Sequence, residues 1–373
     1  MRISQNIHVK KNNSIMKILE IIPTLGSGGA EKFVVELSNE LAEIPNIEVH
    51  LLTFYNRPQD IFREQVSDKV FIHTFNKTTG FSFKIYIKLF KLIKEINPDV
   101  VHSHINAFNY LPLSFLFHRK VRFFHTIHSD AYKEAGKPGR FLRKISFKLH
   151  LSQAIAISES TQDTFRKCYN MELPIIENGC SIYKKTTKDF ILQYKLTDKT
   201  QVLVNVARII GLKNQIMLAK VCSKLIQEGF DIVLLIIGRV IDQSVYSELC
   251  NYIDNQRIIY IGEVTNPRDY MFQADLYCLS SIYEGLPISL LEAFSVNCIP
   301  VCTPVGGIVT LIQNEKNGFL SEDISEDSFY KTLKKALMID EREKMTIKSI
   351  MKKDFEDYTM KKCAEHYFNL FLK

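Results

Sequence analysis

The chain has 373 residues, of which 46% are hydrophobic and 24% charged, and its mean hydropathy is −0.05. This length usually forms two domains, and the composition excludes a disordered chain, a collagen-like repeat and a small disulfide scaffold. The net charge of +7 is uneven: residues 1–190 hold 27 of the 48 basic and 18 of the 41 acidic residues, a net +9, which leaves −2 for the remainder. We therefore expect the basic half to meet an anionic partner, which could be phosphate, anionic lipid or nucleic acid.

The eight cysteines are scattered without a CxxC pair. That pattern is typical of free thiols in a reducing cytoplasm, not of a zinc or redox site. Residues 1–15 lack the apolar core of a signal peptide, and we expect them to form a flexible extension. No stretch approaches about 18 uncharged apolar residues, so a spanning helix is not expected and the protein is expected to be soluble or to lie at a membrane surface.

Short apolar runs alternate with longer amphipathic segments, which is typical of βα units and a parallel sheet. In the first half we expect strands at 16–22, 49–54, 70–73, 100–103, 122–127 and 154–157, and helices at 30–42, 82–96, 107–118, 139–150 and 159–169. A second series follows, with strands at 202–206, 232–237, 258–260, 275–279 and 299–302, and helices at 214–228, 243–253, 287–296, 331–338 and 360–370.

The stretch 181–200 is polar and aperiodic, and we interpret it as a linker. It separates a domain at 16–180 from a second domain at 201–356. The last segment, 357–373, is expected to be a helix that packs back on the first domain. Two α/β units in tandem predict a cleft between two sheets, where ligands usually bind.

The most specific segment is 280–307, SSIYEGLPISLLEAFSVNCIPVCTPVGG. A strand ends before it, Glu284-Gly285 makes a turn, and Pro287 suits the first turn of a helix. Glu292 would lie about two helical turns on, on the side nearest Glu284. Backbone N–H groups at the start of such a helix form a ready phosphate site.

This segment resembles the E-G-x-P-x-x-x-x-E signature of family 4 glycosyltransferases, the retaining group 1 type. The resemblance extends over almost the whole chain from Met16. It implies an α/β fold of the GT-B class, in which two Rossmann-like parallel-sheet domains face a central cleft. The N-terminal domain would bind the acceptor and the C-terminal domain the nucleotide sugar.

Two further motifs agree with the family in order and spacing. Residues 206–215 match V-x-R-x-x-x-x-K-N, so Arg208 and Lys213 would neutralise a departing diphosphate. The turn at 26–31 is similar to the family's G-G-A-E, where Gly28 and Gly29 let the backbone approach the donor closely. A nicotinamide enzyme is disfavoured, since residues 51–55 lack the acidic residue expected for the NAD ribose.

Histidines follow two expected strands, as His102-Ser103-His104 and as His125 to His128. Two rings on one strand face could ligate a metal, but no Cys or carboxylate at convincing spacing accompanies them, so no metal site is expected. The family places a histidine near the donor sugar after strand 122–127, and His128 fits it. His104 is a weaker cleft candidate, and a core position suits it equally.

By resemblance, the enzyme is a hexosyltransferase that moves a sugar from a nucleoside diphosphate sugar to a hydroxyl of a glycan or lipid-linked glycan, with retention. Glu284 would hold the donor sugar's hydroxyls and Glu292 those of the ribose. Amides around 285–287 and 306–307 would help the two cations stabilise the leaving diphosphate, with no metal and no cofactor. The implied catalytic residues are Glu284, Arg208, Lys213 and His128, and the implied donor-binding residues are Gly28, Gly29, Arg208, Lys213, Glu284, Gly285, Leu286, Pro287 and Glu292.

Three positions depart from the family pattern: Asn297 stands for Gly, Thr310 for Glu and Ser181 for Asp. They put the choice of donor in doubt more than the reaction. Two alternatives stay open, a GT-B nucleotide-sugar epimerase and a non-catalytic member that binds glycan or a partner enzyme.

Basic and apolar residues recur together at helical spacing in 83–94 and 140–149. Such stripes fit helices lying on anionic lipid, although a solvated basic face is the commoner case. We expect peripheral contact with the inner face of the cytoplasmic membrane and a role in bacterial surface polysaccharide synthesis, as lipopolysaccharide or capsule. Nucleic acid is not expected, because no recognised binding module is present.

Overall fold

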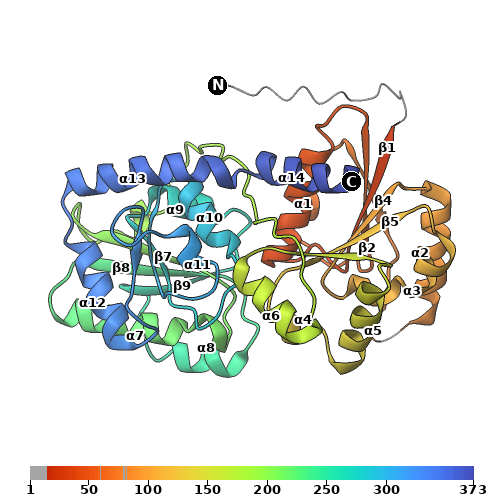
Figure 1. Ribbon diagram of the computed structural model, residues 1–373. Helices are drawn as coiled ribbons and strands as arrows, with labels where there is room; N and C mark the ends of the chain where they lie inside the picture. The colour runs from red at the N-terminus through yellow and green to blue at the C-terminus, as the bar shows by residue number, and fades with distance from the viewer. Residues whose placement is uncertain (1–14, 59, 79, 81) are drawn as a thin grey trace, which may run out of the picture.

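The computed structural model describes residues 15–58, 60–78, 80 and 82–373, so nearly all of the extension expected at 1–15 lies outside the described residues. Within the described part, the chain forms two six-stranded parallel sheets, each lying among helices (Figure 1). The predicted α/β architecture of two Rossmann-like units is therefore confirmed. No helix in this part is long and apolar enough to cross a membrane.

The first sheet has the strand order β3-β2-β1-β4-β5-β6. Its central strands are buried because packed elements cover both faces: all of β4 and the last five residues of β1 are buried, Glu20 among them. The strands are β1 (Met16–Ile22), β2 (Ile47–Thr53), β3 (Val70–Thr74), β4 (Val100–His104), β5 (Arg122–Ile127) and β6 (Gln153–Ala156). The α-helices of this half are α1 (Gly29–Leu41), α2 (Phe83–Ile96), α3 (Pro112–Phe117), α4 (Ala131–Glu134), α5 (Lys137–Lys148) and α6 (Glu159–Tyr169).

The second sheet has the order β12-β11-β10-β7-β8-β9. Its strands are β7 (Gln201–Val206), β8 (Ile232–Ile237), β9 (Ile258–Gly262), β10 (Leu276–Leu279), β11 (Ile299–Cys302) and β12 (Phe319–Leu320). The α-helices are α7 (Gln215–Gln227), α8 (Gln243–Leu249), α9 (Arg268–Gln273), α10 (Ile288–Ser295), α11 (Ile308–Leu311), α12 (Glu326–Leu337), α13 (Glu341–Phe355) and α14 (Met360–Leu372).

The direction of strand order reverses once in each sheet, between β1 and β4 and between β7 and β10. Ligands of doubly wound sheets bind beyond the carboxyl ends of the strands at such a reversal, because the following loops part there. The expected glycine turn follows β1, and the expected cations follow β7. The topology therefore places both motifs at the switch points.

The expected strands all appear, with bounds that shift by at most two residues, but one helix was predicted wrongly, and α4, α9, α11 and α13 were not predicted. The helix expected at 107–118 is a 3-10 turn at Ile105–Tyr110 followed by α3, because Pro112 starts a new helix. Helix α13 was missed, since its sequence is highly charged and has few apolar positions. A capping box starts it: Asp340 Oδ1 accepts from the N–H of Glu343, 2.8 Å away, and Glu343 Oε2 accepts from that of Asp340.

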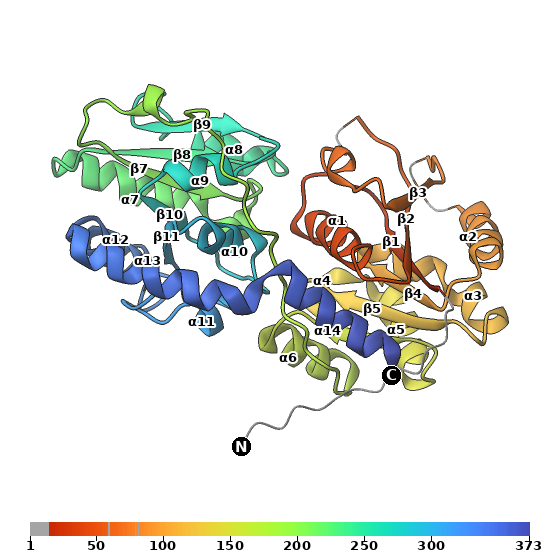
Figure 2. The same cartoon turned by 90° about the horizontal axis from the view of Figure 1, so that it is seen from above.

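The chain crosses between the two sheets twice, and the crossings lie against each other. Residues 181–200 lead to the second sheet, and the stretch between α13 and α14 leads back, so that α14 packs on α1 (Figure 2). Cys180 and the returning chain are paired by backbone hydrogen bonds to Tyr358 and Met360, each 2.9 Å long. At Gly179 a Cβ atom would lie 2.7 Å from the Cβ of Cys363 and from the Cα of Met360.

We predict that Gly179→Ala lowers the free energy of unfolding by about 1–3 kcal/mol, because the added methyl would push the two crossings apart. Thermal unfolding followed by circular dichroism measures this. Gly211→Ala is the control, since a Cβ there meets nothing within 4 Å. Equal melting temperatures for the two variants would contradict the tight crossing.

Candidate active site

A cleft of about 480 Å³ lies between the two domains. Its lining includes the ten residues that the sequence implied for catalysis and donor binding, but neither Gly306 nor Gly307: Gly28, Gly29, His128, Arg208, Lys213, Glu284, Gly285, Leu286, Pro287 and Glu292. The first three come from the loops after β1 and β5, and the others from the second domain. The fold thus brings together residues that are separated by more than 250 positions in the chain.

The carboxylate of Glu284 is fixed by two donors. Lys213 Nζ donates to Oε1 over 2.5 Å, and the Ser281 hydroxyl donates to the same oxygen over 2.6 Å. Glu284 is only 7% exposed, so this pair is shielded from water. The second carboxylate oxygen can still accept from a ligand.

The turn at Gly306 and Gly307 packs closely against the backbone of Glu284 and Gly285. Gly306 has φ +55°, and a Cβ there would lie 1.8 Å from the carbonyl oxygen of Glu284. The N–H of Gly307 donates to the carbonyl of Gly285. The expectation that the Gly307 amide binds the leaving diphosphate is therefore wrong, since that N–H already has an acceptor inside the protein.

Arg208 follows β7 and lines the cleft with an exposed side chain. Its carbonyl accepts from Gln215 Nε2 over 3.0 Å, which fixes the backbone at this point. A guanidinium at the rim can form two parallel hydrogen bonds to a phosphate group. Arg208 and Lys213 therefore place two positive charges on the same side of the cleft.

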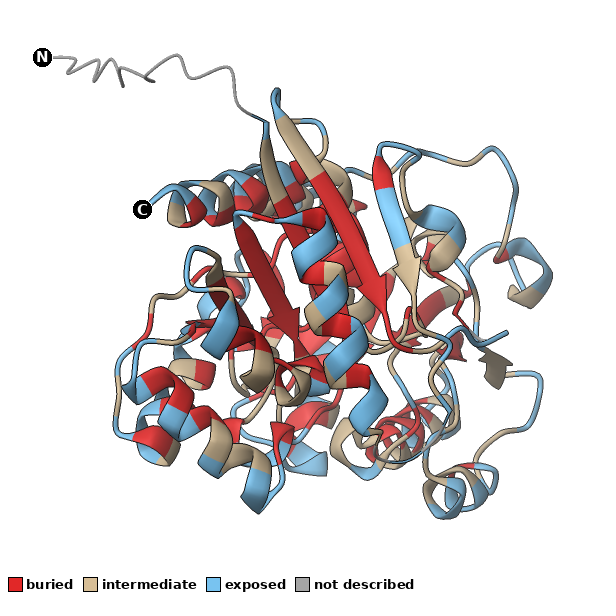
Figure 3. Ribbon diagram, turned by 90° about the vertical axis from the view of Figure 1, so that its right-hand side faces the viewer, coloured by how far each residue is buried: buried red, intermediate tan, exposed pale blue. Residues whose placement is uncertain are grey.

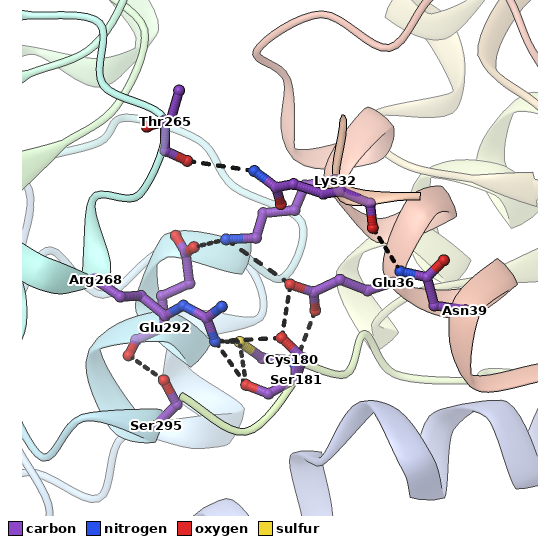
Figure 4. Close-up of polar contacts among 10 residues, drawn as sticks. Lys32, Glu36, Asn39, Cys180, Ser181, Thr265, Arg268, Glu292 and Ser295 are labelled. Carbon is purple, nitrogen blue, oxygen red and sulfur yellow. Dashed lines mark hydrogen bonds and ion pairs between the residues drawn. The ribbon is translucent and has the colours of Figure 1, made fainter. Parts of the chain in front are cut away.

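Glu292 meets a residue that the sequence analysis did not identify. Lys32 of α1 is ion-paired with Glu292 of α10, and Glu36 lies 3.8 Å from the same ammonium (Figure 4). Burial lowers the pKa of Lys32, but the carboxylates of Glu292 and Glu36 outweigh it and leave this pKa above its ordinary value. The ammonium therefore stays charged although only 8% of the side chain is exposed.

The ion pair is part of a wider cluster that joins the domains. Glu36 accepts from the N–H and the hydroxyl of Ser181 over 2.8 and 2.9 Å. Arg268 of α9 donates to the Ser181 carbonyl over 2.7 Å. We call Lys32, Glu36, Arg268 and Glu292 the interdomain cluster; its two positive and two negative charges balance.

The interdomain cluster explains why a serine at position 181 can replace the aspartate of the family pattern. A serine there donates to Glu36, whereas an aspartate would place a second carboxylate next to that of Glu36.

The other two departures lie outside the interdomain cluster. Asn297 has φ +56°, a left-handed conformation that Asn tolerates better than most residues other than Gly. Thr310 is exposed, and its hydroxyl donates to the Gly307 carbonyl over 2.8 Å.

The histidines separate into one cleft residue and three core residues. His128 lines the cleft, while His102, His104 and His125 are fully buried, so the cleft position considered for His104 is wrong. The sequence offered no carboxylate for them, but the structure supplies Glu20 of β1. Among the described residues, Glu20, His102 and His104 could offer ligand atoms to a metal, all within 4.8 Å of one another.

A second buried carboxylate holds the loop that carries His128. Glu134 Oε2 accepts from the backbone N–H of His128 over 3.0 Å, and Arg143 donates to Oε1 over 3.2 Å. Burial raises the pKa of Glu134, but Arg143 and His125 outweigh it and lower this pKa to about 2. Glu134 is therefore ionised at neutral pH and anchors the loop.

Comparison with known proteins identifies the family of the chain. The family model of Glycosyltransferase Family 4 matches residues 27–182, and that of Glycosyl transferases group 1 matches residues 187–353. A Campylobacter jejuni enzyme is 24% identical over 95% of this chain and 98% of its own; it is named GalNAc-alpha-(1->4)-GalNAc-alpha-(1->3)-diNAcBac-PP-undecaprenol alpha-1,4-N-acetyl-D-galactosaminyltransferase.

Two further proteins are similar over most of the chain. The Staphylococcus aureus capsular polysaccharide biosynthesis glycosyltransferase CapH is 25% identical over 87% of this chain and 91% of its own. The crystal structure of Anabaena HepE with UDP and glucose superposes with a TM-score of 0.80 at 18% identity, covering 96% of this chain and all of that one.

We predict that Lys32→Met lowers the free energy of unfolding by about 3–5 kcal/mol, because it leaves buried carboxylates without their cation. Denaturant unfolding measures the change. The double variant Lys32→Met/Glu292→Leu should recover much of the loss, since it removes both charges. A single variant as stable as the wild type would show that the pair adds nothing to the fold.

Proposed function

Because the chain belongs to the glycosyltransferases that join a family 4 domain to a group 1 domain in a GT-B fold, we propose that it is a retaining enzyme for a lipid-linked glycan. It moves a hexose from a nucleoside diphosphate sugar to a hydroxyl of that glycan. The observation that carries this proposal is the placement of Arg208, Lys213 and Glu284 together on one wall of the interdomain cleft.

Each of these side chains has a task in the reaction. Breaking the glycosidic bond leaves an oxocarbenium-like sugar and a diphosphate whose negative charge grows, and Arg208 and Lys213 stabilise that charge. Glu284, fixed by Lys213, accepts hydrogen bonds from the hydroxyls of the donor sugar. The acceptor hydroxyl attacks the face that the diphosphate leaves, and the diphosphate takes its proton, so no protein nucleophile is needed.

The partner groups of Glu292 and the glycine turn complete the donor site. Glu292 takes the ribose hydroxyls, and Lys32 holds its carboxylate in one orientation. Gly28 and Gly29 line the cleft at the start of α1, where Gly28 lies under the carboxylate of Glu31 and Gly29 faces Ile288. With two cations in place, the reaction proceeds without a metal ion, and the donor is a uridine diphosphate sugar, the nucleotide that HepE holds.

The names of related enzymes indicate an acceptor that is anchored in a membrane. The acceptor in the name of the Campylobacter enzyme is linked through PP to undecaprenol, and CapH is named for capsular polysaccharide. We propose an acceptor of the same class, lipid-linked and at the inner face of the cytoplasmic membrane, in surface polysaccharide synthesis.

A surface of the first domain suits such a location. We call the outer sides of α2, α3 and α5 the basic face; they lie at the end of the molecule turned toward the viewer in Figure 3. Phe83, Phe117 and Phe141 are 65%, 65% and 68% exposed there. Exposed lysines accompany them: Lys84, Lys88, Lys91, Lys94, Lys144 and Lys148. Aromatic rings with lysines around them bind anionic lipid surfaces.

We predict that Arg208→Ala lowers turnover at least about 100-fold without loss of folding, because one donor to the developing charge is removed. Release of nucleotide from UDP-, GDP-, ADP- and CMP-sugars, with and without EDTA, measures activity and identifies the donor. Arg342→Ala, an exposed substitution on α13, is the control. Turnover that needs a divalent ion, or that survives in Arg208→Ala, would contradict the proposed mechanism.

We predict that Lys84→Glu/Lys91→Glu weakens binding to anionic vesicles by about tenfold or more, since each lysine near the surface contributes about 1 kcal/mol. Flotation with vesicles of phosphatidylglycerol and phosphatidylcholine measures it. Lys352→Glu/Lys353→Glu, an equal charge change on α13 of the other domain, should bind as the wild type does. Equal loss in both variants would show only a general effect of net charge.

A further inference from the structure

A chain of hydrogen bonds runs from the cleft into the core of the first domain. Nε2 of His128 lies 2.9 Å from Nδ1 of His104, and Nε2 of His104 lies 2.8 Å from Oε2 of Glu20. Nδ1 of His102 lies 2.9 Å from the same carboxylate oxygen and 3.1 Å from the other, Oε1. We call Glu20, His102, His104 and His128 the histidine relay.

The register of the sheet explains why these residues meet. Glu20 of β1 pairs with His102 of β4, and His104 pairs with Thr126 of β5. Side chains two apart on a strand share a face, so all four lie on one face of the sheet. Phe33 of α1 and Tyr367 of α14 cover that face through ring contacts with His104 and His102. Glu20, His102 and His104 are fully buried as a result.

The far end of the relay fixes the hydrogen on His102. The hydroxyl of Tyr367 lies 2.9 Å from Thr126 Oγ1, which lies 2.8 Å from Nε2 of His102. In the described residues this threonine is the hydrogen-bond partner found for the buried tyrosine, so the tyrosine must donate. The threonine then donates to Nε2, and His102 carries its hydrogen on Nδ1, facing Glu20.

Two imidazole nitrogens thus face the carboxylate of Glu20: that of His104 meets Oε2, and that of His102 lies within hydrogen-bond distance of both oxygens. This arrangement suits an ionised carboxylate, which only accepts. Burial raises the pKa of Glu20 above its ordinary value, and the contact with His104 offsets only part of this rise. Burial also holds the pKa values of His102 and His104 well below the ordinary range, so both rings are neutral. With His104 donating from Nε2 to Glu20, its Nδ1 is an acceptor.

We propose that Glu20 is a positioning residue that sets, through His104, which nitrogen of His128 carries hydrogen. His128 donates from Nε2 to His104 and keeps Nδ1 bare, as an acceptor for a hydroxyl of the bound sugar. This role rests on the proposed function, since it needs a sugar in the cleft. The hydrogen arrangement itself belongs to the free protein.

Replacing one carboxylate oxygen of Glu20 by an amide N–H₂ group should shift the hydrogens along the histidine relay. In Glu20→Gln the amide oxygen takes the position of Oε1 and accepts from His102, whose hydrogen is fixed by Thr126. The amide N–H₂ then takes the position of Oε2, where it faces His104 and donates to Nε2. The hydrogen of His104 then moves to Nδ1, and that of His128 moves to Nδ1 as well. His128 would offer a donor where the wild type offers an acceptor.

Nuclear magnetic resonance of the full chain with ¹⁵N-labelled histidine tests this, because bare and protonated ring nitrogens have distinct shifts. We expect Nδ1 of His128 to be bare in the wild type and protonated in Glu20→Gln. Tyr367→Phe, which keeps Glu20 and the ring of Tyr367, should leave His128 unchanged. A wild type with hydrogen on Nδ1, or a folded Glu20→Gln with the wild-type pattern, would overturn the proposal.

Metal analysis of the same samples separates an alternative. A metal ion on Glu20, His102 and His104 would need both of their facing nitrogens bare, which reverses the hydrogens of His104 and His128. One equivalent of zinc in the purified protein would therefore overturn the assignment. The wild-type spectrum decides even if Glu20→Gln fails to fold.

The kinetic consequence is a split between binding and turnover. Once the donor is known, Glu20→Gln should lower kcat about tenfold, the loss expected for one misdirected hydrogen bond, with a smaller change in KM. Since the spectrum needs no donor, a failure of the donor screen would count against the proposed function and leave the assignment of hydrogens standing.

Discussion

The contact between Lys32 and Glu292 is the interaction on which the active-site geometry depends. It joins the first helix of one domain to the helix that carries the donor signature of the other. A buried charge without a partner is far more costly than an ion pair, so neither residue can leave the contact without help. In the proposed function a donor binds next to this pair, and its ribose hydroxyls share Glu292. The contact between the domains and the proposed recognition of the nucleotide would then use the same carboxylate.

The interdomain cluster and the histidine relay follow different electrostatic rules. In the interdomain cluster two cations face two anions, so the charges balance within a small buried volume. In the relay one carboxylate is met by neutral rings, which stabilise it through hydrogen bonds alone. The first arrangement resists separation of the domains. The second keeps a line of imidazoles in defined orientations and holds no cation near the cleft, where Arg208 and Lys213 already supply positive charge.

Much of the fold and of the site could be predicted from the sequence, because local patterns determine both. Apolar runs such as Ile232–Ile237 define strands, and the spacing of Glu284, Gly285 and Glu292 places a motif at a helix start. What the sequence could not show is pairing across long separations. Lys32 meets Glu292, and Glu20 meets His104, only because two sheets and a strand register bring them together. Helix α13 was not predicted for another reason. Its surface is charged nearly all round, so no hydrophobic periodicity indicates it, and its start is marked only by the capping box of Asp340 and Glu343.

The path of α14 has a consequence for how the chain matures. The first sheet is complete once β6 has been made, but one face of it, with Glu20 and His102, is covered by Tyr367 and Phe371 near the end of the sequence. During synthesis that face has to wait for the last residues to leave the ribosome. The first domain therefore cannot complete its folding before the second domain and α14 have been synthesised, although its own strands come first in the sequence.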